Sequence, residues 1–461
     1  MNRNNRMIRT TLTYFIGNFG SKLLSFLLLP LYTYWLSPEQ FGEIDLILNI
    51  VPLIGPIFTL QTTETIFRFL FECKTEKEKK INITNAFVIY MCGIIVFFVL
   101  YIPFSVIWKF KYSLLFGSYF IMLYLSLFVQ QIMRGFQKNI LYSLSGVIST
   151  LVYGLTNIFL IRIMSEESLL VAPTLGAISI IIFGVSKIKL YSFLDYKLID
   201  IKIIKKQLNY SLPLVPNQIS WWINGVIGKY IVNFFIGTSA NGILAVATKF
   251  PNLLSTITQI YFLAWIENSI YEYKSKDRDE YFSKNLNGLI EFLLFSMSGI
   301  LIVVKIYFLY TIGEKYNQAL KIVPILFLAM LFNSISTFLG SVYTASQKTK
   351  DAFFTTVYAG VFNIVLSFVM IPKIGLYGYA FANLFSYIIF SLVRLKSVKK
   401  ICNIKIKFPS IISVISFIIS YSSYLYFDVF ENFVVLFIIG ILFLYNYRDL
   451  IKKFLIKNNN T

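Results

Sequence analysis

Residues 81–104 read INITNAFVIYMCGIIVFFVLYIPF, and none of them is charged. A helix needs about 20 mostly apolar residues to cross the hydrocarbon core of a bilayer, so this stretch is long enough to span a membrane. It follows directly on the basic segment formed by residues 74–80. An uncharged run bounded by lysines is typical of a transmembrane helix beside a cytoplasmic loop.

The composition of the whole chain agrees with this interpretation. Of 461 residues, 57% are hydrophobic and 14% are charged, which leaves too little charge to cover the surfaces of soluble domains. The sequence has no histidine, and its three cysteines show no C-x-x-C spacing. We therefore expect neither a metal site nor a disulfide framework, and no cofactor or catalytic centre.

Apolar runs of similar length recur from one end of the chain to the other. They predict an all-α polytopic membrane protein with about 14 transmembrane helices. The N-terminal run is too long for a cleaved signal peptide and is predicted to be the first, retained span. The predicted spans are residues 10–36, 41–70, 81–104, 113–135, 139–163, 169–190, 208–236, 241–270, 286–312, 319–345, 352–371, 375–398, 408–427 and 430–447.

The distribution of charge predicts the orientation of these spans. Few of the 42 Lys and Arg residues fall in the odd-numbered connections, and most of the others lie in the termini and the even-numbered connections or at the span ends beside them. The termini and the even-numbered connections are therefore predicted to be cytoplasmic. This orientation, with attraction to anionic membrane lipids, explains the net charge of +20 without a nucleic-acid partner.

Two short turns indicate an internal repeat. Residues 35–42 read WLSPEQFG and residues 235–242 read FIGTSANG, which places Gly42 and Gly242 200 residues apart. Repeated features in the same order indicate duplication, here into two six-helix lobes with parallel orientation. The predicted divisions are an N-terminal lobe with its linker (1–206), a C-terminal lobe (207–400) and two extra helices with a tail (401–461).

Charged residues inside spans are the candidate functional residues, because a charge there costs several kcal/mol unless it faces water or a partner. The sequence analysis finds no Asp or Glu in the middle of a predicted span. One interpretation is a cationic, water-filled cavity that receives an anion such as pyrophosphate. The other is lysines whose ammonium groups snorkel to the membrane surface. The candidate cations for the cavity are Lys22, Lys229, Lys249 and Lys305.

Uncharged polar residues inside spans support a wet interior, although hydrogen bonding between helices explains each of them equally well. The candidates for lining the cavity are Asn18, Asn217 and Asn224. Prolines concentrate in the first two predicted spans and in the seventh and eighth. Because proline kinks a helix, this pattern is suited to lobes that rock against each other.

Three segments of the sequence resemble a known family. They are GSKLLSFLLLPLYTYWLSPEQFGEIDL (20–46), GILAVATKFPNLL (242–254) and YFLAWIENSI (261–270). They are similar to the Wzx-type oligosaccharide flippases, also called polysaccharide biosynthesis proteins, of the multidrug/oligosaccharidyl-lipid/polysaccharide exporter superfamily. That family often has an Asp-Arg pair in its seventh span, where this chain has Gly228 and Lys229, so the cation is kept and its acidic neighbour is lost.

The resemblance implies a flippase rather than an enzyme. Its expected substrate is an undecaprenyl-pyrophosphate-linked oligosaccharide for O-antigen or capsule synthesis, moved across the bacterial cytoplasmic membrane by alternating access. It also implies a polysaccharide polymerase as a partner, and Lys22 and Lys249 as cavity residues within the matched segments.

Three alternatives stay open at this point. A MATE-type cation-coupled exporter has the same fold but commonly needs an intramembrane carboxylate. A lipid II flippase also has this fold, and the sequence argues less strongly against it. A membrane polysaccharide polymerase or glycosyltransferase typically needs a large outer loop or a carboxylate cluster. The predicted connections are too short for such a loop.

Overall fold

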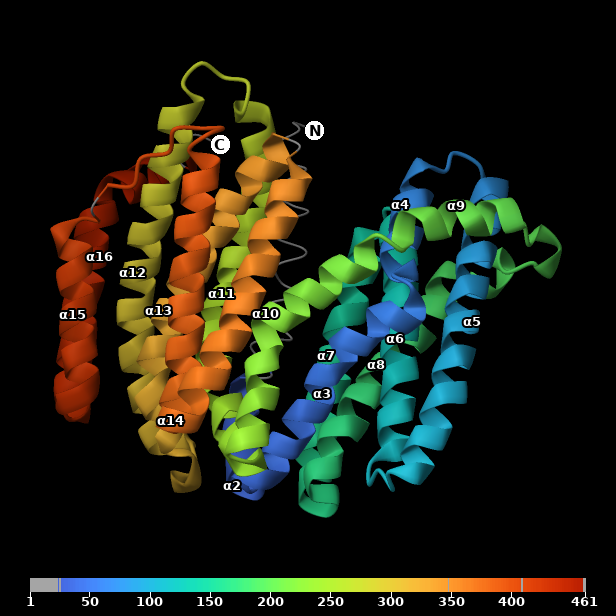
Figure 1. Ribbon diagram of the computed structural model, residues 1–461, viewed down its shortest axis with the longest axis horizontal. Coiled ribbons are helices and arrows are strands. Elements are labelled where there is room, and N and C mark those ends of the chain that lie inside the picture. The colour runs from blue at the N-terminus through green and yellow to red at the C-terminus, as the bar shows by residue number, and fades with distance from the viewer. Residues whose placement is uncertain (1–23, 25, 347, 408, 459–461) are drawn as a thin grey trace. The chain divides into compact units, whose positions relative to one another are not determined.

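The computed structural model describes residues 24, 26–346, 348–407 and 409–458, and the secondary structure of that part is helical throughout (Figure 1). Each span predicted from residue 41 onward coincides with helical residues. The first predicted span is described from residue 24, and α2 (Leu29–Trp35) forms its last turns. The prediction of an all-α polytopic membrane protein is confirmed.

The chain forms two compact units, residues 1–245 and 246–461. This division differs from the predicted lobe boundary at 206/207, because α10 packs against α3 and so belongs to unit 1. After α2, the helices of unit 1 are α3 (Pro38–Thr59), α4 (Thr62–Glu72), α5 (Glu76–Ile107), α6 (Ser113–Gly135), α7 (Asn139–Met164), α8 (Ser168–Ile188), α9 (Ile201–Ser211) and α10 (Leu214–Phe235).

The start of α3 is set by its own sequence. The Ser37 side chain accepts a hydrogen bond from the Gln40 backbone, and the Gln40 side chain accepts one from the Ser37 backbone. Pro38 occupies the first helical position, where its missing N–H would have had no partner within the helix. The turn that the sequence analysis identified as a repeat marker is therefore a helix start with a capping box.

The predicted span over residues 41–70 is two helices rather than one. Leu60 and Gln61 take left-handed backbone conformations, with φ of 49° and 55°, and separate α3 from α4. The hydroxyls of Thr62 and Thr65 donate to the carbonyls of Thr59 and Gln61, which satisfies backbone groups exposed by the break. These local bonds support a conformation that residues with a side chain rarely adopt.

The core of unit 1 between α3, α5 and α6 is aromatic. The rings of Phe97 and Phe120 stack with their centroids 4.1 Å apart, and Phe116 and Tyr124 are buried beside them. Aromatic pairs in such offset contacts add stabilisation beyond the area they bury. This packing holds α3 against the rest of the unit.

The segment between α8 and α10 is tied to one end of α5. Thr84 donates to the carbonyl of Phe193, and the Asn85 side chain bonds both the carbonyl of Leu198 and the N–H of Asp200. These contacts place α9 across the end of α5, where it also packs on α4. The predicted cytoplasmic linker is therefore an ordered part of unit 1.

Unit 2 begins within α11 (Thr238–Glu272). Its other helices are α12 (Arg278–Thr311), α13 (Gln318–Ala345), α14 (Thr349–Val398), α15 (Ile411–Tyr426) and α16 (Val429–Asn458). Non-helical residues at Ile374 and Gly375 divide α14 into the two predicted spans 352–371 and 375–398, and Gly375 supplies a positive φ of 60°.

The two extra C-terminal helices pack on α12 within unit 2 (Figure 1). One face of α15 is a stripe of buried serines, and small residues of this kind let membrane helices approach closely. They are Ser413, Ser416, Ser420 and Ser423. The predicted last two spans are thus integrated into unit 2.

Apolar length varies among the helices. In the described part of the chain, seven helical stretches are long and apolar enough to cross a membrane, and α10 is not among them. Its sequence is interrupted by Asn217, Gln218, Asn224, Lys229 and Asn233. Polar side chains inside a membrane helix need polar partners.

Candidate functional site

The Lys229 side chain on α10 forms an ion pair with Asp45 on α3. The ammonium Nζ lies 2.8 Å from Asp45 Oδ2, and the two side chains are only 9% and 13% exposed. A charged hydrogen bond removed from water in this way is stronger than one at the surface. Removing one partner from a buried pair typically costs about 3–5 kcal/mol, because it leaves the other charge uncompensated.

Asn241, in the first turn of α11, joins the same carboxylate. Its Nδ2 donates to the Gly42 carbonyl at 2.9 Å and lies 3.4 Å from Asp45 Oδ2. The residues belong to unit 1 and come from three helices, α3, α10 and α11. Asp45 is therefore the acceptor on which two neighbouring helices converge.

Further contacts follow one stripe of α3 toward its middle. The Tyr230 hydroxyl donates to the Leu46 carbonyl at 2.8 Å, and Trp222 Nε1 donates to the Asn49 carbonyl at 2.6 Å. Asp45, Leu46 and Asn49 are spaced to lie on one side of a helix. Trp222, Lys229 and Tyr230 of α10 therefore all find their hydrogen-bond acceptors on this stripe of α3.

The start of α3 also meets the start of α11 through two glycines. A Cβ built on Gly42 would lie 2.6 Å from the Gly242 nitrogen and would overlap the Thr238 carbonyl oxygen. A Cβ built on Gly242 would overlap the Pro38 carbonyl oxygen. The two glycines that the internal repeat pairs are thus in direct backbone contact, close to Asp45.

The sequence analysis missed Asp45. It found no carboxylate in the middle of a span, yet Asp45 lies inside α3 and reaches a lysine 184 residues away. The expectation concerned the middle of spans, whereas Asp45 lies near the start of the predicted span 41–70. A comparison of depth could have found it, because Asp45 lies seven residues after the start of α3 and Lys229 lies six residues before the end of α10.

The other predicted site residues have varied positions. Lys22 and Asn18 lie outside the described residues. Lys249 is half-buried on α11 in unit 2. Asn224 is buried and donates to the Ser220 carbonyl of its own helix, whereas Asn217 is exposed.

Lys305 of α12, predicted as a cavity cation, reaches the C-terminal end of α15 with its ammonium group. Its Nζ donates to the carbonyls of Ser423 and Phe427 at 3.2 and 2.6 Å. A cation at a helix C-terminus is stabilised by the unpaired carbonyls and the helix dipole. The structure thus places Lys305 in a contact that holds α15 to α12, and we leave it out of the site.

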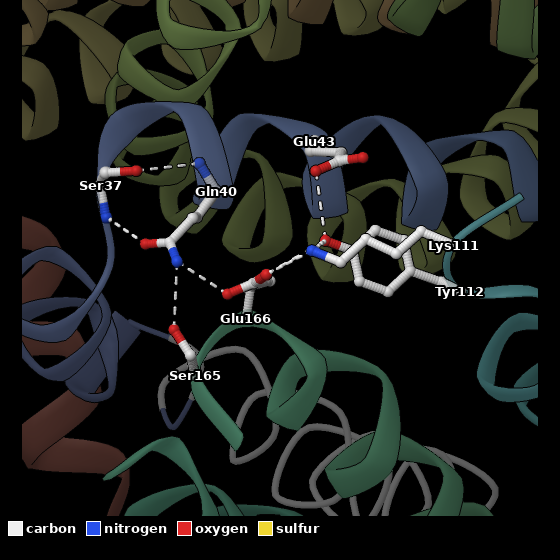
Figure 2. A network of polar contacts seen from close by, with 7 residues as sticks. All are labelled: Ser37, Gln40, Glu43, Lys111, Tyr112, Ser165 and Glu166. Carbon is white, nitrogen blue, oxygen red and sulfur yellow. Dashed lines mark hydrogen bonds and ion pairs between the residues drawn. The ribbon is translucent and has the colours of Figure 1, made fainter. Parts of the chain in front are cut away.

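A second polar cluster lies at the connections that precede α3, α6 and α8 (Figure 2). The carboxylate of Glu166 accepts hydrogen bonds from Lys111 Nζ at 2.9 Å and from Gln40 Nε2 at 2.8 Å. The Tyr112 hydroxyl lies 3.2 Å from oxygens of both Glu166 and Glu43. The cluster connects the capped start of α3 to two other helices of unit 1.

Burial alone would raise the pKa of the Glu166 carboxyl, but hydrogen bonds and the charge of Lys111 lower that pKa to about 2. The hydrogen bonds that Lys111 donates to Tyr112 and Glu166 raise the pKa of Lys111. Glu166 is therefore ionised at neutral pH. The cluster therefore anchors the start of α3 to the connections before α6 and α8. Among the described residues, it shares no hydrogen-bond partner with Asp45.

The buried ion pair can exchange partners without covalent chemistry. An anionic group that reaches Lys229 would compete with Asp45, and a proton or cation that reaches Asp45 would compete with Lys229. Either event weakens the link between α3 and α10. Such a pair is suited to a binding site coupled to the separation of helices.

Three comparisons describe what the chain is similar to. A family model described as polysaccharide biosynthesis protein matches residues 7–266. No curated protein sequence matches the chain. The fold is shared with a structure titled lipid II flippase MurJ, inward closed conformation, with a TM-score of 0.71 and 20% identity over 96% of this chain and 100% of that one.

A second solved structure has the same fold. It is titled as the inward-facing conformation of a multidrug resistance MATE family transporter of the MOP superfamily. The TM-score is 0.66 at 12% identity, over 84% of this chain and 95% of that one. At these identities the likeness establishes the fold alone.

Proposed function

Because the chain belongs to the polysaccharide biosynthesis protein family, we propose that it is a flippase for undecaprenyl-pyrophosphate-linked oligosaccharide repeat units. The proposed setting is the bacterial cytoplasmic membrane, during O-antigen or capsule synthesis, with handover to a polysaccharide polymerase. The observation that supports this proposal most directly is the largely buried Asp45–Lys229 pair between helices of a membrane protein. The shared fold with a flippase and an exporter agrees with alternating access.

Lys229 has the properties required to receive a diphosphate. An anion that leaves water for a low-dielectric interior loses its hydration and needs a cation there. Asp45 keeps the ammonium oriented and compensated while no substrate is present. When the diphosphate binds Lys229, Asp45 loses its ionic partner, and the link between α3 and α10 weakens. Lys22 and Lys249 are proposed as further cations along the route.

One observation favours a second candidate, a cation-coupled exporter. Asp45 is the intramembrane carboxylate that such an exporter commonly needs and that the sequence analysis did not find. Within the pair, however, a cationic drug would have to displace Lys229 from Asp45, just as a diphosphate would have to displace Asp45 from Lys229. The two candidates differ in which member of the pair meets the substrate.

Charge variants at position 229 test the proposal. In a strain deleted for the native gene, we expect Lys229→Arg to support export, Lys229→Ala to reduce it and Lys229→Glu to reduce it further. The measurement is lipid-linked oligosaccharide accumulated at the inner leaflet, normalised to protein in the membrane. Lys321→Ala, which removes an exposed lysine, is the matched control. The same ranking is expected at Lys249.

The outcomes separate the candidates. Equal accumulation for the Arg, Ala and Glu variants at normal abundance would contradict a substrate-binding role for Lys229. A drug-resistance phenotype that depends on Asp45 and tolerates Lys229→Ala would favour the exporter. The double variant Asp45→Ala/Lys229→Ala separates folding from function, because it should be more abundant than either single variant and still not export.

A further inference from the structure

Unit 1 has two apolar hollows along α3 and α5. The first, about 480 Å³, lies between α3, α5, α6 and α10, and its lining includes Ile50, Ile54 and Phe116. The second, about 490 Å³, lies between the end of α3, α5 and α9, and its lining includes Ile204 and Leu208. Both are lined almost entirely by apolar side chains.

The two hollows are neighbours along α3 and α5, because Phe58 and Leu100 line both of them. The apolar face that they form together is called the groove below. At Gly93, a Cβ would overlap the Phe58 carbonyl oxygen, so the backbones of α3 and α5 touch there. The helices cannot move closer at this point.

The length of the groove is informative. Its lining on α3 runs from Leu46 to Leu60, fourteen residues or about 21 Å at 1.5 Å per residue. One leaflet of a bilayer with a hydrocarbon core of about 30 Å is about 15 Å deep. A phospholipid acyl chain confined to one leaflet is therefore shorter than the groove, whereas a long polyisoprenoid chain can follow its whole length.

The groove starts beside the ion pair. Leu46 and Tyr230, which line the first hollow, directly follow Asp45 and Lys229 in sequence and are joined by the hydrogen bond from the Tyr230 hydroxyl to the Leu46 carbonyl. A charged site next to a long apolar groove is complementary to an amphiphile with an anionic head and a long tail. Neither part of this arrangement alone requires such a ligand.

We infer that the groove between α3 and α5 binds the polyisoprenoid tail of the lipid-linked substrate while Lys229 binds its diphosphate. This inference rests on the proposed function and extends it to a tail-binding site. The exposed ring of Phe104, which lines the first hollow, offers contacts to the branched methyl groups of an isoprenoid. The tail site lies on unit 1, on the same helix as Asp45.

Two adjacent residues of α5 provide a matched test. Leu100 lines both hollows and is 59% exposed, whereas Val99 is 64% exposed and lines neither. The photoreactive residue p-benzoylphenylalanine is placed at each position of the full chain. The protein is then reconstituted in vesicles of phosphatidylethanolamine and phosphatidylglycerol with undecaprenyl pyrophosphate as a minor lipid. Mass spectrometry measures the adducts.

We expect undecaprenyl adducts to be enriched several-fold over phospholipid adducts at position 100 relative to position 99. Ile54, which lines the first hollow from α3, should behave as position 100 does. Undecaprenol, which lacks the diphosphate, should also be enriched at position 100. Equal adduct ratios at positions 99 and 100 would identify an ordinary phospholipid site and overturn the inference. Enrichment that vanishes with undecaprenol would assign the preference to the head group and overturn it too.

The test separates this inference from the proposed function. If Lys229 variants block export while positions 99 and 100 give equal ratios, the groove is not the tail site but the function stands. If position 100 is enriched while every Lys229 variant exports normally, the groove binds a polyisoprenoid, but the proposed role of Lys229 fails.

Discussion

Gly42 and Gly242 lie in direct backbone contact where α3 and α11 begin, next to the carboxylate of Asp45. The Asn241 side chain donates to the Gly42 carbonyl across the same contact. A residue with a Cβ at either position would overlap a backbone atom of the other helix. The absence of side chains there brings Asn241 within reach of α3.

This contact predicts that alanine is not tolerated at either glycine. Gly42→Ala and Gly242→Ala should each lower stability by about 1–3 kcal/mol, since backbone atoms have to move apart. Gly225→Ala is the control, because a Cβ there meets nothing within 4 Å. Thermal unfolding of the purified protein in detergent measures the effect. An unfolding midpoint for Gly42→Ala equal to that of Gly225→Ala would show that the contact is not tight.

The orientation in the membrane is a prediction from charge that reporter fusions can test. A reporter fused after Lys80, Lys206 or Lys284 should report the cytoplasm, and one fused after Gln40 or Ser239 the outside. Both termini are then cytoplasmic. Opposite results at two or more of these sites would reverse the orientation.

The spans were predictable because lipid contact requires long apolar runs, and such runs are visible in a single sequence. The division of α14 was also predictable, since it coincides with Gly375. The break between α3 and α4 was not, because Leu60 and Gln61 are not turn formers. Two prolines lie within α3, and neither of them ends it.

The site was predictable in part. Lys229 could be identified as a candidate because a lysine inside a span is costly. Its partner could not be found by local spacing, because Asp45 is 184 residues away. Lys305 attracted attention for the same reason as Lys229, but its partners are backbone carbonyls at the end of α15, which carry no sequence signal.

The Glu166 cluster predicts a pH dependence of stability. Burial raises the pKa of Glu166, but hydrogen bonds from Lys111, from its own backbone N–H and from Ser165, together with the charge of Lys111, lower that pKa to about 2 from an ordinary value of 4.5. A lowered pKa in the folded state means that the stabilisation is present above about pH 4.5 and is lost as the pH falls toward 2. Lys111 and Tyr112 stay protonated across this range.

Glu166→Gln should therefore remove part of the loss of stability between pH 4.5 and pH 2 and lower stability at pH 7. Glu167→Gln is the matched control, because it removes a neighbouring carboxylate that takes no part in the cluster of Figure 2. The unfolding midpoint measured across this pH range gives the result. Parallel pH profiles for wild type and Glu166→Gln would show that the cluster does not contribute.

The connection that leads to α15 runs along α12 and is held there by side chains one helical turn apart. Lys405 N donates to Ser283 Oγ at 3.0 Å, and Ser410 N donates to Glu291 Oε1 at 3.2 Å. Between them, Asn287 accepts from Lys407 N at 2.9 Å and donates to the Lys405 carbonyl at 3.0 Å. With Lys305 at the far end of α15, these bonds fix both ends of that helix to α12.

Asn287→Ala should release this connection without unfolding α12. It removes two hydrogen bonds to the connection, each contributing about 1 kcal/mol, so amide exchange at Lys407 should accelerate by roughly an order of magnitude or more. Asn285→Ala is the matched control on the same helix, because the Asn285 side chain donates to the Tyr281 carbonyl of α12 itself. Hydrogen exchange of the peptide covering residues 402–410, followed by mass spectrometry, compares the two variants with wild type. Faster exchange in Asn287→Ala alone is the expected result, whereas the same exchange rate in both variants would mean that Asn287 does not hold the connection and that α15 is attached through its serine face and Lys305.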